Sequence, residues 1–182
     1  MVTALLLIDI QNDYFPNGAM ELVSPVEAGN NATKLLEKFR KSNLPIIHIQ
    51  HISMHPGATF FLPDTYGAEI HPCVAPAAGE VFFQKNFPNS FRGTPLLEHL
   101  KESKITTLVI AGMMTHMCID TTTRAAADLG FSCVLAHDAC ATKELSFNGS
   151  LVAAEDVQLA YLAGLNGLFA QVKSTEEVAN DL

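Results

Sequence analysis

The sequence has few of the features that direct a protein to nucleic acid, membranes or an oxidising compartment. Lysine and arginine number 11 against 19 acidic residues, so the net charge is −8 and no basic stripe is present. The apolar N-terminus reaches Asp9 too soon for a secretory signal, and no apolar run has membrane-spanning length. The four cysteines form neither a C-x-x-C pair nor a zinc spacing. We therefore expect a cytoplasmic protein with reduced thiols that binds neither nucleic acid nor membrane.

The bulk composition is that of a compact domain. Hydrophobic residues make up 48% of the 182 residues and charged residues 16%, which argues against disorder. No internal repeat or low-complexity segment divides the chain. We expect a single domain over residues 1–182.

Apolar strand-like runs alternate with helix-like segments along the chain. The expected strands are 4–10, 45–50, 81–84, 107–111, 133–136 and 168–172, and the expected helices are 25–42, 95–103, a segment ending at 129, 151–163 and a short helix that begins with a capping box at 174–177. Alternation of this kind predicts an α/β fold, with three α-β-α layers around a six-stranded parallel sheet. We expect the Rossmann-like strand order 3-2-1-4-5-6, with a ligand site between strands 1 and 4.

The most informative stretch is Ile105–Arg124, in which a buried strand, a glycine and a turn lead into a helix. Cys118 falls in the first turn of that helix. Unpaired N–H groups and the helix dipole favour a thiolate there and can hold an oxyanion. The alternative is that Cys118 is a small buried hydrophobic residue, as most free cysteines are.

Two further reactive residues end predicted strands. Asp9 closes the first strand and Lys85 the third, so both fall on the same edge of the sheet as Cys118. The simpler interpretations are that Asp9 caps a turn and that Lys85 is a solvated surface lysine.

Several blocks of the sequence together resemble the isochorismatase-like cysteine hydrolase superfamily, which includes nicotinamidases and N-carbamoylsarcosine amidases. The blocks are LLLIDIQNDYF around Asp9, KNFPNSF from Lys85, AGMMTHMCIDTTTRAAADLG around Cys118, and HDAC from His137. The resemblance covers nearly the whole chain.

The resemblance implies a catalytic triad of Asp9, Lys85 and Cys118 and a cis peptide bond between Met113 and Met114. The N–H groups of Met114 and Cys118 would then form an oxyanion hole. It also implies a small-molecule substrate and a homodimer or homotetramer. On this basis the thiol attacks a small amide, imide or N-carbamoyl compound and forms a thioester.

Four histidines, His48, His51, His55 and His71, raise the question of a metal site. Nicotinamidases hold a metal through an Asp-x-His pair and further histidines after strand 2, and that pair is absent from the corresponding segment Gln50–His55. We therefore expect no metal and no cofactor, and interpret His51 as a polar group of the pocket.

The other expected pocket residues are assigned from their positions near the triad. They are Phe15, Phe87, Phe91 and His116. The alternative for the aromatic residues is that they pack in the core or at a subunit interface. For Phe60 and Phe61, which lie in the long loop after the second strand, the pocket and the subunit interface both remain open. The long segment Ile52–Gly79 has no clear period, and a loop of that length is commonly functional.

Two alternatives to an amidase remain. One branch of the superfamily hydrolyses the vinyl ether of isochorismate without needing a cysteine, and a non-catalytic protein could use the same fold for thiol sensing or assembly. The joint presence of Asp9, Lys85 and Cys118 favours the thiol-dependent hydrolase.

Overall fold

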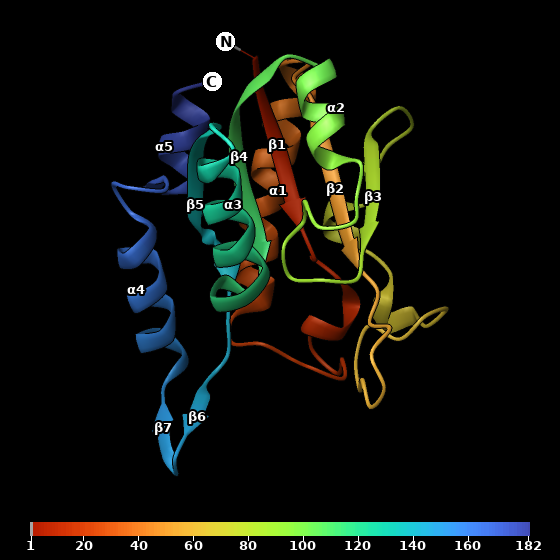
Figure 1. Cartoon of the computed structure of the whole chain (residues 1–182), viewed down its shortest axis with the longest axis vertical. Helices are drawn as coiled ribbons and strands as arrows, with labels where there is room; N and C mark the ends of the chain where they lie inside the picture. Colours follow the sequence, from red (N-terminus) through yellow and green to blue (C-terminus); the bar gives the residue numbers. More distant parts are fainter. Residues whose placement is uncertain (1) are drawn as a thin grey trace.

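The computed structural model describes residues 2–182, which form a three-layer α/β structure (Figure 1). The central sheet is parallel, with strand order β3-β2-β1-β4-β5-β8, and a separate antiparallel hairpin consists of β6 and β7. The bounds are β1 Val2–Ile8, β2 Ile46–His51, β3 Val81–Lys85, β4 Ile105–Met113, β5 Ser132–Ala141, β6 Leu145–Phe147, β7 Ser150–Val152 and β8 Gln171–Lys173. The two hairpin strands precede the last sheet strand in the sequence, so that strand is numbered β8 rather than β6. The predicted order of the six parallel strands is confirmed.

Helices cover both faces of the sheet (Figure 1). They are α1 Pro25–Lys41, α2 Leu96–Glu102, α3 Asp120–Asp128, α4 Ala154–Leu165 and α5 Thr175–Asn180. Helices α1 and α5 pack on one face, and α2, α3 and α4 lie on the other. The predicted capping box at Ser174 and Glu177 begins α5.

The strand β1 shows how the sequence forms a sheet that is buried on both faces. Leu5 and Leu7 pack towards α1, whereas Leu6 and Ile8 pack towards α2 and α3. Because successive strand residues point to opposite faces, a continuous apolar run contributes to both cores. Burial of these strands fixes the register on which the site depends.

Three element boundaries differ from the sequence predictions by three residues or more, and the others by two or fewer. Strand β5 continues to Ala141 through an irregularity in its pairing with β4, so it passes the expected end at residue 136. Helix α4 begins at Ala154 rather than 151 because the preceding residues belong to the β6–β7 hairpin. The turn Asn148-Gly149 joins the hairpin with positive φ at both residues, a pattern that Asn-Gly sequences favour. Strand β8 begins at Gln171, not at 168.

The long segment between β2 and β3 is tied to the sheet by three polar side chains that follow β1. Gln11 donates to the carbonyls of His51 (2.9 Å) and Ala68 (2.7 Å) and accepts from the His51 N–H (2.7 Å). Asn12 donates to the Tyr66 carbonyl (2.8 Å). We call Gln11, Asn12 and Asp13 the clasp.

Asp13, the third residue of the clasp, accepts from the Phe61 N–H at 2.6 Å and from the Ala19 N–H at 3.1 Å. A Cβ at Gly67 would overlap the Asp13 carboxylate, so glycine is required there. The segment that we expected to lack secondary structure contains two short 3₁₀ turns, Tyr66–Ala68 and Pro72–Val74, and is anchored along its length.

Gly112 lets β4 approach β1 closely beside the site. Its φ is +141°, and a Cβ would overlap the carbonyl oxygen of Ile8, which precedes Asp9. We expect Gly112→Ala to lower the free energy of unfolding by about 3 kcal/mol or more, because the added methyl group would clash with the Ile8 backbone, which the sheet holds in place. Urea denaturation followed by circular dichroism measures this.

Gly164→Ala is the matched control for Gly112→Ala. Gly164 lies inside α4, and a Cβ there meets only the end of the flexible Arg124 side chain, at 3.6 Å. This change should be neutral or slightly stabilising. Equal stability of the two variants would contradict the close approach of β4 and β1.

Candidate active site

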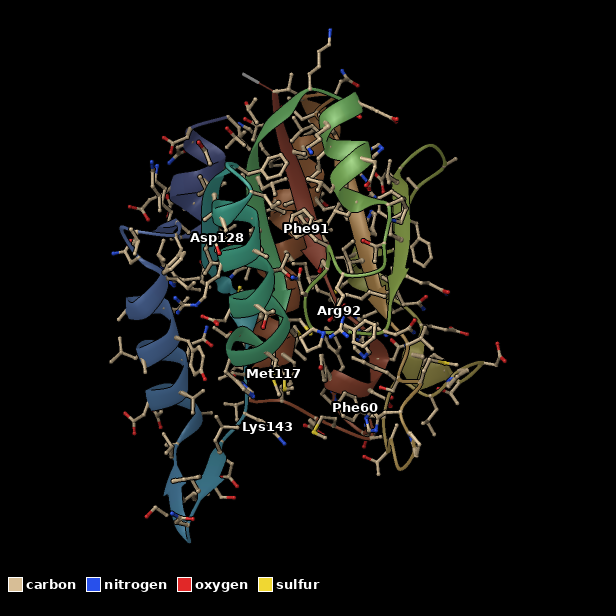
Figure 2. All side chains as sticks on the ribbon, in the orientation of Figure 1. Phe60, Phe91, Arg92, Met117, Asp128 and Lys143 are labelled. Carbon is tan, nitrogen blue, oxygen red and sulfur yellow. The ribbon has the colours of Figure 1, made fainter. Side chains whose placement is uncertain are left out.

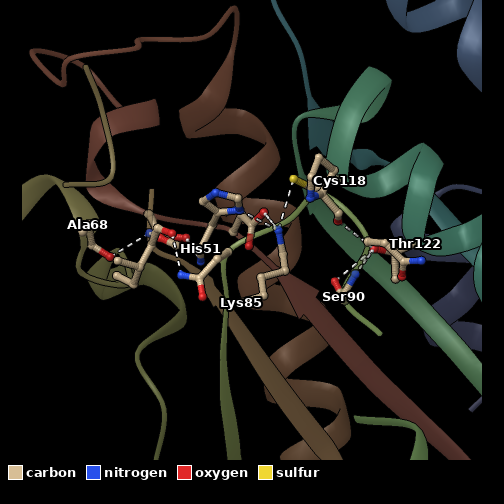
Figure 3. A network of polar contacts seen from close by, with 12 residues as sticks. His51, Ala68, Lys85, Ser90, Cys118 and Thr122 are labelled. Carbon is tan, nitrogen blue, oxygen red and sulfur yellow. Dashed lines mark hydrogen bonds and ion pairs between the residues drawn. The ribbon is translucent and has the colours of Figure 1, made fainter. Parts of the chain in front are cut away.

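Three predicted residues come together at the carboxyl edge of the sheet (Figure 3). The Lys85 ammonium, at the end of β3, lies 2.6 Å from the Asp9 carboxylate and 3.2 Å from the Cys118 sulfur. Asp9 follows β1 with φ +54°, a left-handed conformation that Asp tolerates better than most residues. The sheet order thus places the expected residues within hydrogen-bonding distance.

All three side chains are shielded from water. Asp9 is 0% exposed, Lys85 1% and Cys118 5%. Burial lowers the pKa of Lys85, but the charges and hydrogen bonds of Asp9 and Cys118 outweigh it, so the pKa is raised overall. Lys85 is therefore a cation paired with the Asp9 carboxylate.

The protonation state of Cys118 differs from the sequence-based expectation. Burial, assisted by the nearby Asp9 carboxylate, raises the pKa of the Cys118 thiol well above its ordinary value, although Lys85 opposes this shift. The expected bias towards thiolate is thus wrong for the resting site. Desolvation exceeds the effect of the helix terminus, and Cys118 is a thiol beside a carboxylate.

Cys118 lies on a π-helical turn, Thr115–Ile119, immediately before α3. It therefore precedes the regular helix rather than occupying its first turn, and such turns are frequent at functional sites. The Met113–Met114 peptide bond is cis, as the resemblance implied. The Met114 carbonyl accepts from the N–H groups of Met117 (3.0 Å) and Ile119 (3.3 Å), which ties the turn to this bond.

His51, at the end of β2, contacts the same ammonium. Its Nδ1 lies 3.0 Å from Lys85 Nζ, and the two residues are direct neighbours in the β2–β3 register. Burial and the Lys85 charge lower the pKa of His51 to about 4, so the ring is neutral at pH 7. A neutral Nδ1 facing an ammonium accepts the hydrogen bond.

Asp9, His51 and Cys118 also form the one group of potential metal ligands found among residues 2–182. Their ligand atoms lie within 4.8 Å of one another. The ammonium of Lys85, however, is within hydrogen-bonding distance of all three residues. A metal ion bound by this trio would have to displace that fixed positive charge, so the residues fit a metal poorly.

The other histidines of this region lie at separate positions. His48 is paired with Glu80 at 2.8 Å, and His55 is exposed beside the Pro56 carbonyl. His71 stacks on Phe15 with ring centroids 3.6 Å apart. The four histidines are therefore not gathered into one ligand set.

The remaining predicted pocket residues have contacts away from the triad. Phe15 is buried against His71 and Gly29, and Phe91 stacks on Phe131. Phe87 lies beneath the Arg92 guanidinium, 3.7 Å from the ring centroid. Figure 2 shows Phe91 and Arg92 on the side of the sheet that carries α2 and α3.

His116 is also turned to another partner. Its Nδ1 lies 2.6 Å from the Thr142 hydroxyl, and its ring meets Tyr161 edge-on. Within residues 2–182, His51 is the predicted pocket residue that forms a hydrogen bond with a triad residue.

Two further aromatic residues belong to this region: Tyr14, which the sequence did not single out, and Phe61, whose role the sequence left open. Tyr14 is buried, and burial, with smaller contributions from Cys118 and Asp9, raises the pKa of its hydroxyl well above the ordinary value. Phe61 is buried against Tyr14, with centroids 4.5 Å apart, and its ring lies 6.0 Å from that of His51. Tyr14 could have been singled out from the sequence, because it directly follows Asp13, the last residue of the clasp.

A second polar contact fixes the segment after Lys85 on the helix after Cys118. The Ser90 N–H and hydroxyl lie 3.1 and 3.0 Å from the Thr122 hydroxyl (Figure 3). Both residues are fully buried. This contact joins the two chain segments that carry the lysine and the thiol.

Fold and site together define a three-layer α/β protein with a buried thiol–lysine–carboxylate cluster at the carboxyl edge of its sheet. The family model described as the isochorismatase domain matches residues 3–177. The chain is 50% identical over 176 residues to the uncharacterised isochorismatase family protein YddQ of Bacillus subtilis, covering 97% of this chain and 98% of that protein. The chain therefore belongs to the isochorismatase family, whose members are hydrolases.

Solved structures agree with this assignment. A crystal structure from Oleispira antarctica, assigned to the isochorismatase hydrolases, superposes with a TM-score of 0.95 at 48% identity, covering 98% of this chain and 96% of that one. A more distant relative is nicotinamidase 3 of Arabidopsis thaliana, 27% identical over 175 residues, covering 88% of this chain and 81% of that protein. The family thus includes an amidase.

No helix within residues 2–182 combines the length and apolar character needed to cross a membrane.

Proposed function

We propose that this chain is a metal-independent cysteine amidase that hydrolyses a small amide, imide or N-carbamoyl compound. The observation that carries the proposal is the position of Lys85 Nζ, within hydrogen-bonding distance of both Asp9 and Cys118 in a shielded site. A buried carboxylate beside a thiol supplies a base, and the ammonium stabilises the thiolate as it forms. Oxygen Oδ1 of Asp9 has no hydrogen-bond partner among the described residues, so it is free to accept a proton.

The first half of the proposed reaction forms a thioester. Asp9 takes the thiol proton of Cys118 as the sulfur attacks the carbonyl carbon, and the N–H groups of Met114 and Cys118 hold the oxyanion. The C–N bond then breaks, and Asp9 returns the proton to the leaving nitrogen. Because the resting thiol is protonated, proton transfer accompanies attack.

The second half regenerates the thiol. Asp9 takes a proton from water, and the resulting hydroxide attacks the thioester carbon. The C–S bond breaks, the carboxylic acid leaves, and the proton passes from Asp9 to the Cys118 sulfur. The scheme needs a reduced thiol throughout, so the proposal includes a reducing compartment, the cytoplasm.

The test is ammonia release from a panel of small primary amides and N-carbamoyl compounds, chromatography of the acid products of small imides, and mass spectrometry of the quenched enzyme. We expect at least one compound to be hydrolysed and to leave an acyl mass increment on the peptide that contains Cys118. Isochorismate is included because the vinyl-ether branch of the superfamily does not need the cysteine. Turnover of isochorismate alone, or no turnover of any compound, would overturn the amidase assignment.

We also propose that the chain forms a homodimer through α4 and the β6–β7 hairpin. Both project from the body of the molecule (Figure 1), and apolar side chains are exposed on them, including Phe147 (76%), Leu151 (65%) and Leu159 (68%). Only Val157 and Leu165 of α4 are buried. A two-fold axis would pair this surface with the same surface of a second copy. Exposed apolar surfaces of this kind commonly mark protein–protein interfaces.

Leu159→Glu should convert the dimer to a monomer, because it would place two carboxylates in an apolar interface. Size-exclusion chromatography with light scattering measures the mass at micromolar concentration. Val26→Glu, at a 44% exposed apolar position on α1, is the control and should leave the mass unchanged. A monomeric wild-type protein would contradict the proposed interface.

A further inference from the structure

We propose that His51 is a positioning residue that aims the Lys85 ammonium at the reacting thiol by accepting its third hydrogen bond. The inference rests on the proposed function, because it assigns a role within the same thiol-dependent site. It differs from the role expected from sequence, in which His51 lines the substrate pocket.

The hydrogen-bonding capacity of Lys85 leads to this assignment. A lysine ammonium has three N–H donors and no acceptor. The three acceptors around it are the Asp9 carboxylate at 2.6 Å, the Cys118 sulfur at 3.2 Å and His51 Nδ1 at 3.0 Å. With all three engaged, the orientation of the ammonium about its Cε–Nζ bond is determined, and one N–H is held on the sulfur.

At Nδ1, the ring of His51 acts as an acceptor towards Lys85. Burial and the Lys85 charge keep it neutral at pH 7, and the hydrogen bond from Lys85 places the ring proton on Nε2. Loss of this acceptor would leave two acceptors for three N–H groups, so the rotation of the ammonium about Cε–Nζ would no longer be fixed and its N–H would no longer be held on the sulfur.

The backbone N–H and carbonyl of His51 are both held by the Gln11 side chain. Its N–H donates to Gln11 Oε1 (2.7 Å), and its carbonyl accepts from Gln11 Nε2 (2.9 Å). Gln11 is fully buried and stands two residues after Asp9. The segment that supplies the base therefore also fixes the residue that orients the lysine.

The position of His51 in the sheet accounts for this role. The carboxyl end of β2 lies between those of β1 and β3, so its last residue must stand between Asp9 and Lys85. Phe61 packs beside the imidazole, with ring centroids 6.0 Å apart. An aromatic replacement can therefore keep the packing while it removes the acceptor.

The experiment measures the rate of alkylation of Cys118 by iodoacetamide, a small primary amide, at pH 8 by peptide mass mapping. His51→Phe removes the acceptor and keeps a ring, whereas His51→Asn keeps an acceptor oxygen near the position of Nδ1. His55→Leu removes an exposed histidine from the loop that follows His51 and is the matched control. Cys73, which is half-buried, serves as the internal reference in every sample.

We expect Cys118 of the wild-type protein to react faster than Cys73, although burial raises the pKa of both thiols. The reason is that the Asp9 carboxylate can take the Cys118 proton during attack and the Lys85 ammonium stabilises the thiolate that forms. The rate should fall by about tenfold or more in His51→Phe, through misplacement of the ammonium. It should recover most of that loss in His51→Asn and stay at the wild-type value in His55→Leu. If His51→Phe does not fold, His51→Leu takes its place against His51→Asn.

The outcomes separate the two proposals. A wild-type Cys118 no more reactive than Cys73 would count against the proposed function itself. A selectively reactive wild-type thiol with an unchanged rate in His51→Phe would overturn the role of His51 and leave the amidase intact. Equal losses in folded His51→Phe and His51→Asn would also overturn it, since an acceptor would then not restore the rate.

Discussion

Replacement of Cys118 with alanine is expected to lower the turnover of any amide that the chain accepts by roughly 10⁵–10⁶-fold, as removal of a catalytic nucleophile does in other hydrolases. The sulfur is the atom that attacks the carbonyl in the proposed scheme, and no other thiol lies within hydrogen-bonding distance of Lys85 among the described residues. Ammonia release under single-turnover and steady-state conditions measures the loss.

The fold of Cys118→Ala should survive. The change removes one atom and leaves one Lys85 N–H without an acceptor, at a cost of about 1–3 kcal/mol. Cys133→Ala is the matched control, since Cys133 is similarly buried but lies on β5, with its sulfur 4.0 Å from the Thr123 carbonyl oxygen. A Cys118→Ala protein with wild-type turnover would eliminate the thioester scheme.

The second large effect concerns stability. Asp9 and Lys85 form an ion pair in which both side chains are 0% exposed. Removing one partner leaves an uncompensated buried charge, so Asp9→Asn and Lys85→Met should each lower the free energy of unfolding by about 3–5 kcal/mol. The double variant should lose clearly less than the sum of the two single losses, because it leaves neither charge unpaired.

Urea denaturation of the four proteins provides this double-mutant cycle. Asp181→Asn makes the same chemical change in an exposed pair with Lys173, whose side chains are 61% and 30% exposed, and should cost less than about 1 kcal/mol. Strictly additive losses for Asp9→Asn and Lys85→Met would show that the two groups do not interact. Both single variants should also lack amidase activity.

The same pair gives a pH dependence of stability. The folded state raises the pKa of Lys85 above its unfolded value, so it binds the proton more tightly than the unfolded chain does. The resulting stabilisation is complete below the unfolded pKa of roughly 10.4 and is lost as the pH rises through the folded pKa. Lys85→Met should lack this alkaline loss.

Much of the scaffold could be predicted from sequence because its signals are local. Apolar runs that alternate with helical periods predict a parallel sheet, and strand order then brings the ends of β1, β3 and β4 to one edge. Asp9 and Lys85 stand at or directly after such ends, and Cys118 follows the third. The hairpin was also detectable, since Asn148-Gly149 is a strong turn signal.

What could not be predicted depends on burial and on contacts between distant segments. The helix-terminal position of Cys118 suggested a thiolate, but the surrounding core reverses that shift, and burial is not visible in the sequence. The partners of four predicted pocket side chains were likewise not visible in the sequence: Phe15 stacks on His71, Phe87 lies beneath Arg92, Phe91 stacks on Phe131, and His116 bonds to Thr142. Proximity along the chain does not fix the direction of a side chain.

The clasp has a consequence for how this protein could change over evolutionary time. The loop atoms that Gln11, Asn12 and Asp13 hold between residues 51 and 68 are backbone N–H and carbonyl groups. Every amino acid except proline supplies both groups. Substitutions along the loop, outside the glycine at position 67, can therefore alter its side chains without releasing its anchors, so the surface that the loop presents can diverge while its backbone stays in place.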